Sequence, residues 1–154
     1  LNNEMDDFSA KPDTPNTSGL VGGAANAIAP GKRMLSSMTP TFLESEHGVA
    51  ILGTPGGSRI VTMVLQAILA VVAGEAPAQW VAKPRLHHQF LPDRLQYEAA
   101  ALTADQVAEL QERGHRTDLV TDGFGNMQGV FWDRAASQVQ AASDPRGRGE
   151  AGVR

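Results

Sequence analysis

Apolar residues recur at intervals of three and four along two stretches of the chain. In 58–72 they form one wide stripe, consisting of Ile60, Val61, Val64, Leu65, Ile68, Leu69 and Val72. This spacing predicts a helix with a broad buried face, ended by Gly74. The stretch 103–113 is predicted to be an amphipathic helix, with Thr103 as its N-cap and Gly114 just after its end.

Shorter apolar runs between turn signals predict strands. The first two, 40–44 and 49–53, flank a turn and form a hairpin. A short helix is expected over 75–82, and further strands over 85–89, 95–98, 130–133 and 137–142. Strands alternate loosely with helices and several connections are hairpin-like. The pattern therefore predicts an α+β chain with a mainly antiparallel sheet and packed helices.

Residues 10–30 lack periodicity and are rich in Gly, Pro, Asn, Ser and Thr. Long loops of this kind in compact domains are lids, binding loops or disordered segments, so a lid-like loop is expected here. Residues 147–154 are polar and Gly-rich, which predicts a flexible tail after one unit spanning 1–146. The chain has no starting Met and no signal peptide, and its beginning reads as cut out of something longer.

Composition removes several classes of function. A formal charge of −4 without a basic patch argues against nucleic acid as a partner. The absence of cysteine excludes disulfides, zinc thiolates and a thiol nucleophile, and suits either cytosol or periplasm. The longest apolar run, 60–73, contains Gln66 and is too short to span a bilayer.

Two polar segments are candidates for binding an amino-acid-like ligand. Glu4 and Asp7 lie three residues apart and could clamp an ammonium group by charge-assisted hydrogen bonds. The alternative is a solvated acidic turn. The neighbouring Ser36 and Ser37 could bind a carboxylate through hydroxyls and backbone amides. Here the alternative is a serine-rich turn.

A third candidate is the bend at Gly56-Gly57, where a predicted strand stops and a helix starts. Amides exposed there, aided by the positive end of the helix, could stabilise a developing oxyanion. A plain Gly-rich turn is the alternative. The spacing fits neither a phosphate loop nor a dinucleotide-binding fingerprint.

The four histidines are interpreted as structural or surface residues. His87 and His88 are adjacent, so in a strand they would point to opposite faces and could not bind one metal together. His47 falls in a turn and His115 follows a helix. No metal site and no cofactor are expected.

Five segments together resemble the small subunit of the γ-glutamyltransferases, also called γ-glutamyltranspeptidases or glutathione hydrolases. They are LNNEMDDFS at 1–9, GKRMLSSMTPT at 31–41, GTPGGSRI at 53–60, PRLHHQFLPD at 84–93 and ASDPR at 142–146, in the family's order and spacing. The resemblance implies an N-terminal nucleophile hydrolase, in which two stacked sheets lie between helix layers (αββα). It also implies a periplasmic or secreted parent whose precursor cuts itself into a large and a small subunit.

The resemblance implies a role for each candidate. Glu4 and Asp7 match positions that hold the α-ammonium of a γ-glutamyl group, Ser36 and Ser37 match those that bind its α-carboxylate, and Gly56 and Gly57 match the oxyanion hole. The donor is glutathione or another γ-glutamyl compound, and the acyl group passes to water or to an amino-acid or peptide acceptor. All three segments are then expected to converge on one cavity. Some members carry a lid tyrosine where this sequence has Ser18.

In this family the nucleophile is an N-terminal Thr whose own amine serves as base. It is expected a few dozen residues upstream of Leu1, and neither Thr14 nor Thr17 replaces it. The isolated chain is therefore predicted to be inactive, and without the large subunit it should expose apolar sheet surface. Two alternatives stay open: a related amidase of the β-lactam acylase or poly-γ-glutamate type, and a non-catalytic binding or assembly fragment.

Overall fold

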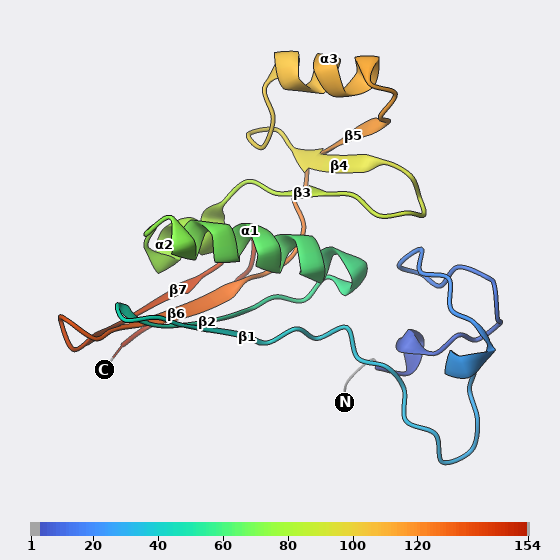
Figure 1. Cartoon of the computed structure of the whole chain (residues 1–154), viewed down its shortest axis with the longest axis horizontal. Helices are drawn as coiled ribbons and strands as arrows, with labels where there is room; N and C mark the ends of the chain where they lie inside the picture. The colour runs from blue at the N-terminus through green and yellow to red at the C-terminus, as the bar shows by residue number, and fades with distance from the viewer. Residues whose placement is uncertain (1–3, 154) are drawn as a thin grey trace.

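The computed structural model describes residues 4–153, and its framework is two sheets of different size (Figure 1). The larger sheet has the strand order β1-β2-β6-β7, and each neighbouring pair is antiparallel. Its strands are β1 (Thr41–Glu44), β2 (Gly48–Gly53), β6 (Gln128–Asp133) and β7 (Gln138–Ser143). The predicted first hairpin and closing pair of strands are confirmed, with ends shifted by one or two residues.

One face of the larger sheet carries the helices α1 (Ile60–Val72) and α2 (Pro77–Ala82) (Figure 1). The 3-10 turn η3 (Gly57–Arg59) leads into α1. The hydrophobic core between these layers is formed by Ala50, Leu52, Ile60, Met63, Val64, Ala67, Ala70, Trp80, Val81, Phe124 and Met127. Burial of these side chains supplies the main driving force that holds the helices on the sheet.

The predicted buried stripe of α1 was only partly correct. Ile60 and Val64 are buried, but four other stripe residues are exposed, namely Val61, Leu65, Leu69 and Val72. The buried face instead uses Met63 together with the small residues Ala67 and Ala70. Because α1 is apolar on nearly every side, periodicity alone could not select the face that packs on the sheet.

The smaller sheet contains β3 (Leu86–His87), β4 (Leu95–Glu98) and β5 (Thr117–Val120). β3 and β4 are antiparallel, whereas β4 and β5 are parallel and are connected through α3 (Ala104–Glu112). The prediction placed no strand at β5 and made β3 too long. Gln66, one of two polar residues of α1, links this helix to the smaller sheet by donating from its side-chain amide to the backbone carbonyl of Leu86 at 2.9 Å.

The predicted lid-like loop lies beyond one end of α1 and of the larger sheet (Figure 1). It is preceded by the 3-10 turn η1 (Glu4–Asp7) and includes a second one, η2 (Ala24–Asn26). The loop is closed by its own backbone hydrogen bonds, from Ser9 N to Asn26 O at 3.0 Å and from Asn16 N to Leu20 O at 2.9 Å. The loop is therefore folded back on itself beside η1.

No part of residues 4–153 covers the second face of the larger sheet. Phe42, Ile51 and Val130 occupy directly paired positions on β1, β2 and β6, so their side chains share one face of the sheet. All three are exposed, Phe42 to 68%. This agrees with the expectation of half a sandwich. Within 4–153, no helix is long and apolar enough to cross a membrane.

Candidate functional site

A cavity of about 450 Å³, here called cavity A, lies between η1 and the approach to β1. Its lining includes Asp7, Ser36 and Ser37 together with residues of the 10–30 loop. Asn26 fixes η1 beside the loop, because its side-chain amide donates a hydrogen bond to the Asp7 carbonyl at 2.6 Å. Residues about 30 positions apart in the sequence thus share one hollow.

The segment around the serine pair is held by local hydrogen bonds. Met38 N donates to Ser36 Oγ at 3.3 Å, and Thr39 Oγ1 donates to the Ser37 carbonyl at 3.1 Å. Cavity A consequently has a carboxylate at one part of its wall and hydroxyls at another, which suits a zwitterionic amino acid. Glu4 is half-buried on the same turn as Asp7 but is not part of the cavity lining.

The Gly56-Gly57 bend has a backbone conformation that favours glycine, with φ values of +151° and +57°. A Cβ atom at Gly56 would meet Met63 Cε at 2.6 Å, and one at Gly57 would meet Ser18 Oγ at 2.7 Å. Neither amide of the bend donates a hydrogen bond to another residue in the described range. Within residues 4–153, both amides thus lack a protein acceptor.

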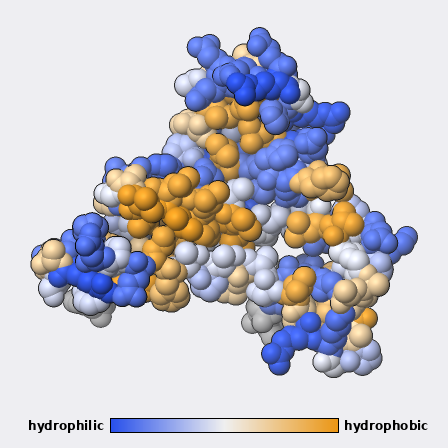
Figure 2. All heavy atoms as spheres, viewed as in Figure 1, coloured by the Kyte–Doolittle hydropathy of each residue, from blue (hydrophilic) through white to orange (hydrophobic). Residues whose placement is uncertain are grey.

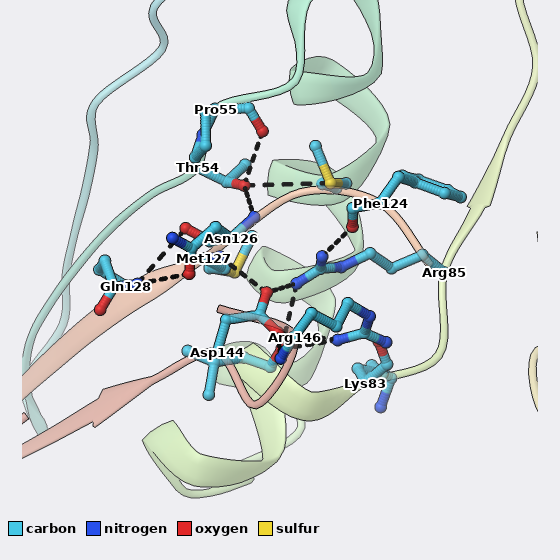
Figure 3. Close-up of polar contacts among 12 residues, drawn as sticks. Thr54, Pro55, Lys83, Arg85, Phe124, Asn126, Met127, Gln128, Asp144 and Arg146 are labelled. Carbon is cyan, nitrogen blue, oxygen red and sulfur yellow. Dashed lines mark hydrogen bonds and ion pairs between the residues drawn. The ribbon is translucent and has the colours of Figure 1, made fainter. Parts of the chain in front are cut away.

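Thr54 anchors the start of this bend (Figure 3). Its Oγ1 donates to the Pro55 carbonyl at 3.0 Å and accepts a hydrogen bond from Asn126 N at 3.1 Å. Asn126 immediately precedes Met127, which is buried in the core. The bend is thereby attached to the rigid part of the fold.

A second cavity of about 420 Å³, cavity B, lies on the other side of the lid-like loop. Its lining comprises Asn16, Thr17, Ser18, Gly19, Gly56, Ser58, Arg59, His87, Gln89, Pro92, Arg94 and Gln96. Asn16 lines both cavities, but Gly56 lines only cavity B. The expectation that all three segments would line one cavity is therefore wrong, because the loop divides the space into two adjoining hollows.

Between the two cavities, the lid-like loop is attached to the rest of the fold through the carbonyl of Ser18. That carbonyl accepts hydrogen bonds from Gln89 Nε2 at 2.9 Å and from Ser58 Oγ at 3.3 Å. Asn16 shapes the turn because its Oδ1 accepts from the backbone amides of Ser18 and Leu20. Ser18 also lies against the bend, because a Cβ at Gly57 would meet its Oγ at 2.7 Å.

His87 is a buried wall residue of cavity B. Its Nδ1 lies 2.8 Å from Thr62 Oγ1 and its Nε2 lies 2.8 Å from Gln89 Oε1. Burial lowers the pKa of His87 below its usual value and Arg59 lowers it further, against the opposing effect of the hydrogen bond to Gln89. The interpretation as a structural residue fits these contacts, because both ring nitrogens bind protein atoms.

Sequence reasoning missed cavity B. Arg59 was part of a recognised motif but received no role, and no pattern connected it with Gln89 or Gln96. Their proximity arises because β3 and β4 lie beside the start of α1, which is a tertiary arrangement. Among the described residues, no cluster of three or more His, Asp or Glu side chains could hold a metal ion.

Comparison with known proteins identifies the family. The sequence profile described as gamma-glutamyltranspeptidase matches residues 1–153. This chain belongs to the γ-glutamyltranspeptidase family. It is 46% identical over 153 residues to a glutathione hydrolase proenzyme of Pseudomonas aeruginosa, covering 97% of this chain and 27% of that relative. It is 43% identical over 148 residues to one of Escherichia coli, covering 95% of this chain and 25% of that relative.

Solved γ-glutamyltranspeptidases confirm the fold. The Pseudomonas nitroreducens γ-glutamyltranspeptidase in complex with L-DON superposes with a TM-score of 0.84 at 44% identity, covering 99% of this chain and 80% of that one. The predicted class, an α+β part of an N-terminal nucleophile hydrolase, is therefore correct. The chain spans about a quarter of the length of the curated γ-glutamyltranspeptidase relatives named above.

Proposed function

We propose that this chain is the pocket-bearing part of a longer γ-glutamyltransferase that cleaves glutathione or related γ-glutamyl amides. The observation that carries the proposal is cavity A, where Asp7 and the Ser36-Ser37 pair line one hollow. A γ-glutamyl group ends in a zwitterion, so its ammonium needs an anion and its carboxylate needs hydrogen-bond donors. Membership of the family supports the same substrate class.

The chemistry assigned to the chain is stabilisation of charge. A Thr hydroxyl upstream of Leu1 attacks the γ-carbonyl carbon, and negative charge develops on the carbonyl oxygen. The amides of Gly56 and Gly57 donate to that oxygen, and removing one such donor typically costs about 2.7–4 kcal/mol of transition-state stabilisation. Collapse of the tetrahedral intermediate breaks the C–N bond, and the amine leaves with the proton that the Thr hydroxyl gave up to its own α-amine. The acyl-enzyme then passes its γ-glutamyl group to water or to an amino-acid or peptide acceptor.

Asp7 and Glu4 are assigned to the ammonium of the substrate. Asp7 lines cavity A directly, while Glu4 lies on the same 3-10 turn and is half-buried. Ser36 and Ser37 are assigned to the carboxylate. The periplasmic or secreted location of the parent rests on the family resemblance alone and stays a prediction.

The proposed partner is the large subunit of the same precursor. The uncovered sheet face offers Phe42, Ile51, Val130 and Trp132 to a second layer. An apolar face of this kind on a soluble domain marks a contact surface. The isolated 154-residue chain is accordingly expected to release no p-nitroaniline from γ-glutamyl-p-nitroanilide.

The test is Asp7→Asn in the full-length precursor, which removes the charge and keeps the size of the side chain. Loss of a hydrogen bond to a charged group lowers kcat/KM for γ-glutamyl-p-nitroanilide by about 10- to 150-fold. The control is Asp13→Asn, an exposed residue of the loop that does not line cavity A, with activity expected within about twofold. Equal activities of the two variants would contradict the assignment.

A glutaryl donor separates the alternatives, because it lacks the α-amino group. The wild-type enzyme should prefer the γ-glutamyl donor, and Asp7→Asn should reduce that preference. A wild-type preference for the glutaryl donor would favour a β-lactam acylase type of amidase. Absence of turnover of either donor by the processed full-length protein would favour the non-catalytic alternative.

A further inference from the structure

We propose that Thr54 is a positioning residue for the reaction, whose hydroxyl holds the Gly56-Gly57 bend in the place from which its amides donate to the developing oxyanion. Thr54 is half-buried and lines neither cavity A nor cavity B, so it acts through the backbone that it fixes. The proposal rests on the proposed function, because it takes the bend as the place where charge develops on the γ-carbonyl oxygen.

Thr54 stands where β2 leaves the larger sheet. The last paired residues of β2 and β6 are Gly53 and Gln128. Past this pair a side chain continues the connection between the two segments, because Asn126 N donates to Thr54 Oγ1 at 3.1 Å (Figure 3). The hydroxyl thus takes the acceptor role that a backbone carbonyl has in a regular antiparallel ladder.

The same hydroxyl fixes the residue directly before the glycine pair. Its O–H donates to the Pro55 carbonyl at 3.0 Å while its oxygen accepts from Asn126 N. A hydroxyl carries one donor and two lone pairs, so both hydrogen bonds form at once. Since Thr is β-branched, its χ1 is restricted and the hydroxyl has few alternative positions.

The two sides of the bend are fixed in different ways. On the α1 side, Arg59 N donates to the Gly56 carbonyl at 3.2 Å and Ile60 N donates to the Gly57 carbonyl. These hydrogen bonds lie within one turn and move with it. The hydroxyl of Thr54 instead connects the strand side of the bend to a separate segment, residues 124–127.

Met63 of α1 fills the space between the bend and this segment. Its side chain is 1% exposed, and its Sδ lies 4.0 Å from Thr54 Oγ1. A Cβ at Gly56 would meet Met63 Cε at 2.6 Å, and one at Gly125 would overlap Met63 Sδ. Because these groups are in close contact, a shift of Thr54 changes the support beneath Gly56.

The segment that carries the Asn126 donor is itself rigidly held. On one side of Asn126, the Phe124 carbonyl accepts a hydrogen bond from Arg85 Nη1 (Figure 3). On the other side, Met127 N donates to Asp144 Oδ2 at 2.8 Å. The amide of Asn126 is therefore a fixed reference to which Thr54 holds the bend.

A positioning role has a specific kinetic consequence. Oxyanion donors act when they lie about 2.7–3.1 Å from the charged oxygen, and a displacement of about 1 Å can cost about 100-fold in rate. Formation and breakdown of the acyl-enzyme both place charge on the same oxygen. Loss of the Thr54 hydroxyl should therefore slow both steps, while binding of the glutamyl zwitterion in cavity A is unchanged.

The experiment compares Thr54→Val with wild type in the full-length, processed enzyme. Valine keeps the size and the β-branch but offers no acceptor to Asn126 N. We expect kcat for γ-glutamyl-p-nitroanilide to fall about 10- to 100-fold, with KM within about twofold. A boronic acid analogue of glutamate, which mimics the tetrahedral state, should lose affinity by a similar factor. Thr54→Ser keeps the hydroxyl and should retain at least about half of the wild-type kcat.

Thr117→Val is the matched control. Thr117 lies on β5 and is also half-buried, and its hydroxyl accepts a hydrogen bond from Gln111 Nε2 at 2.7 Å. This variant likewise loses one threonine hydroxyl and leaves one donor without its acceptor, but far from the bend in the sequence. Its kcat should stay within about twofold of wild type, as for substitutions away from the site.

The outcomes separate the positioning role from the proposed function. A processed wild-type enzyme that turns over no γ-glutamyl donor contradicts the proposed function. If the wild type is active and Thr54→Val matches Thr117→Val in kcat, or differs from it in KM alone, the positioning role is wrong. Should Thr54→Val give no processed enzyme, Thr54→Ser and Thr54→Ala repeat the comparison without the methyl group, and equal kcat values for those two would overturn the proposal.

Discussion

Gly57 faces Ser18 across a gap that leaves no room for a methyl group. Its φ of +57° lies in the left-handed region, and a Cβ atom there would be 2.7 Å from Ser18 Oγ. Alanine in this conformation costs roughly 1–2 kcal/mol before any steric contact is counted. The residue thus sets both the shape of the bend and the distance to the loop.

We expect Gly57→Ala in the full-length enzyme to lower kcat for γ-glutamyl-p-nitroanilide at least about tenfold, because the shifted bend misplaces an oxyanion donor. Adding Ser18→Ala should restore part of the activity by removing the contacting oxygen. Gly53→Ala is the matched control, because a Cβ at Gly53 meets nothing within 4 Å. If Gly57→Ala were as active as Gly53→Ala, the bend would have no catalytic role.

Single residues differ in how well the sequence predicts their place. The glycine pair was predictable because glycine itself signals an unusual backbone, and the structure gives both residues positive φ. Of the three segments expected on one cavity, the turn with Asp7 and the serine pair line cavity A, whereas the glycine bend does not. Arg59 was not predicted to line a cavity, because its surroundings come from β3 and β4, about 30 residues away in the chain.

At the level of elements, a buried ion network joins the two sheets to the segment that follows β7 (Figure 3). Asp144, just after β7, forms an ion pair with Arg85, just before β3, and accepts a hydrogen bond from Met127 N at 2.8 Å. Arg146 Nε donates to Glu98 Oε1, at the end of β4, at 2.7 Å. The network fixes β3 and β4 relative to β6 and β7, and hence the wall of cavity B.

Asp144→Asn should destabilise the chain by about 3–5 kcal/mol, because it leaves the buried charge of Arg85 without its partner. The side chains of both residues are at most 3% exposed. Asp118→Asn is the control, since its ion pair with Arg94 is half exposed and contributes about 1 kcal/mol or less. Urea unfolding of the two variants measures the difference, and similar midpoints would contradict the role of the network.

The same residue predicts the pH dependence of stability. Burial alone would raise the pKa of Asp144, but the amides of Arg146 and Met127 and the guanidinium of Arg85 outweigh it and hold the pKa below its usual value. A depressed pKa in the folded state contributes stability that is present above the unfolded pKa, about 3.9, and is lost as pH falls further. Asp144→Asn should lack this part of the acid destabilisation.

Elements with local signals were predicted better than those that depend on partners. The N-cap of α3 is confirmed by the hydrogen bond from Gln106 N to Thr103 Oγ1 at 3.2 Å. β5 was missed for two reasons. Its four residues contain only two apolar side chains, Leu119 and Val120. It also pairs in parallel with β4, and the chain that connects these two strands includes α3. Such a strand is defined by its neighbour and not by its own pattern.

At the scale of the whole molecule, the chain exposes two apolar surfaces. One is the outer side of α1, where apolar side chains gather in Figure 2; they belong to Val61, Leu65, Leu69 and Val72. The other is the uncovered face of the larger sheet. The chain covers only about a quarter of its curated relatives, so these surfaces are consistent with contacts to the rest of a longer protein.

The uncovered sheet face should make the isolated chain self-associate. Phe42 and Trp132 are 68% and 44% exposed on this face, and burying each in a contact is worth about 1.5–3 kcal/mol. The double variant Phe42→Thr with Trp132→Thr keeps strand propensity and should raise the dissociation constant at least about tenfold. Leu119→Thr, an exposed strand residue of the smaller sheet, is the control and should change it little. Sedimentation equilibrium measures both, and a wild-type chain that stays monomeric at high micromolar concentration would show that this face needs no partner.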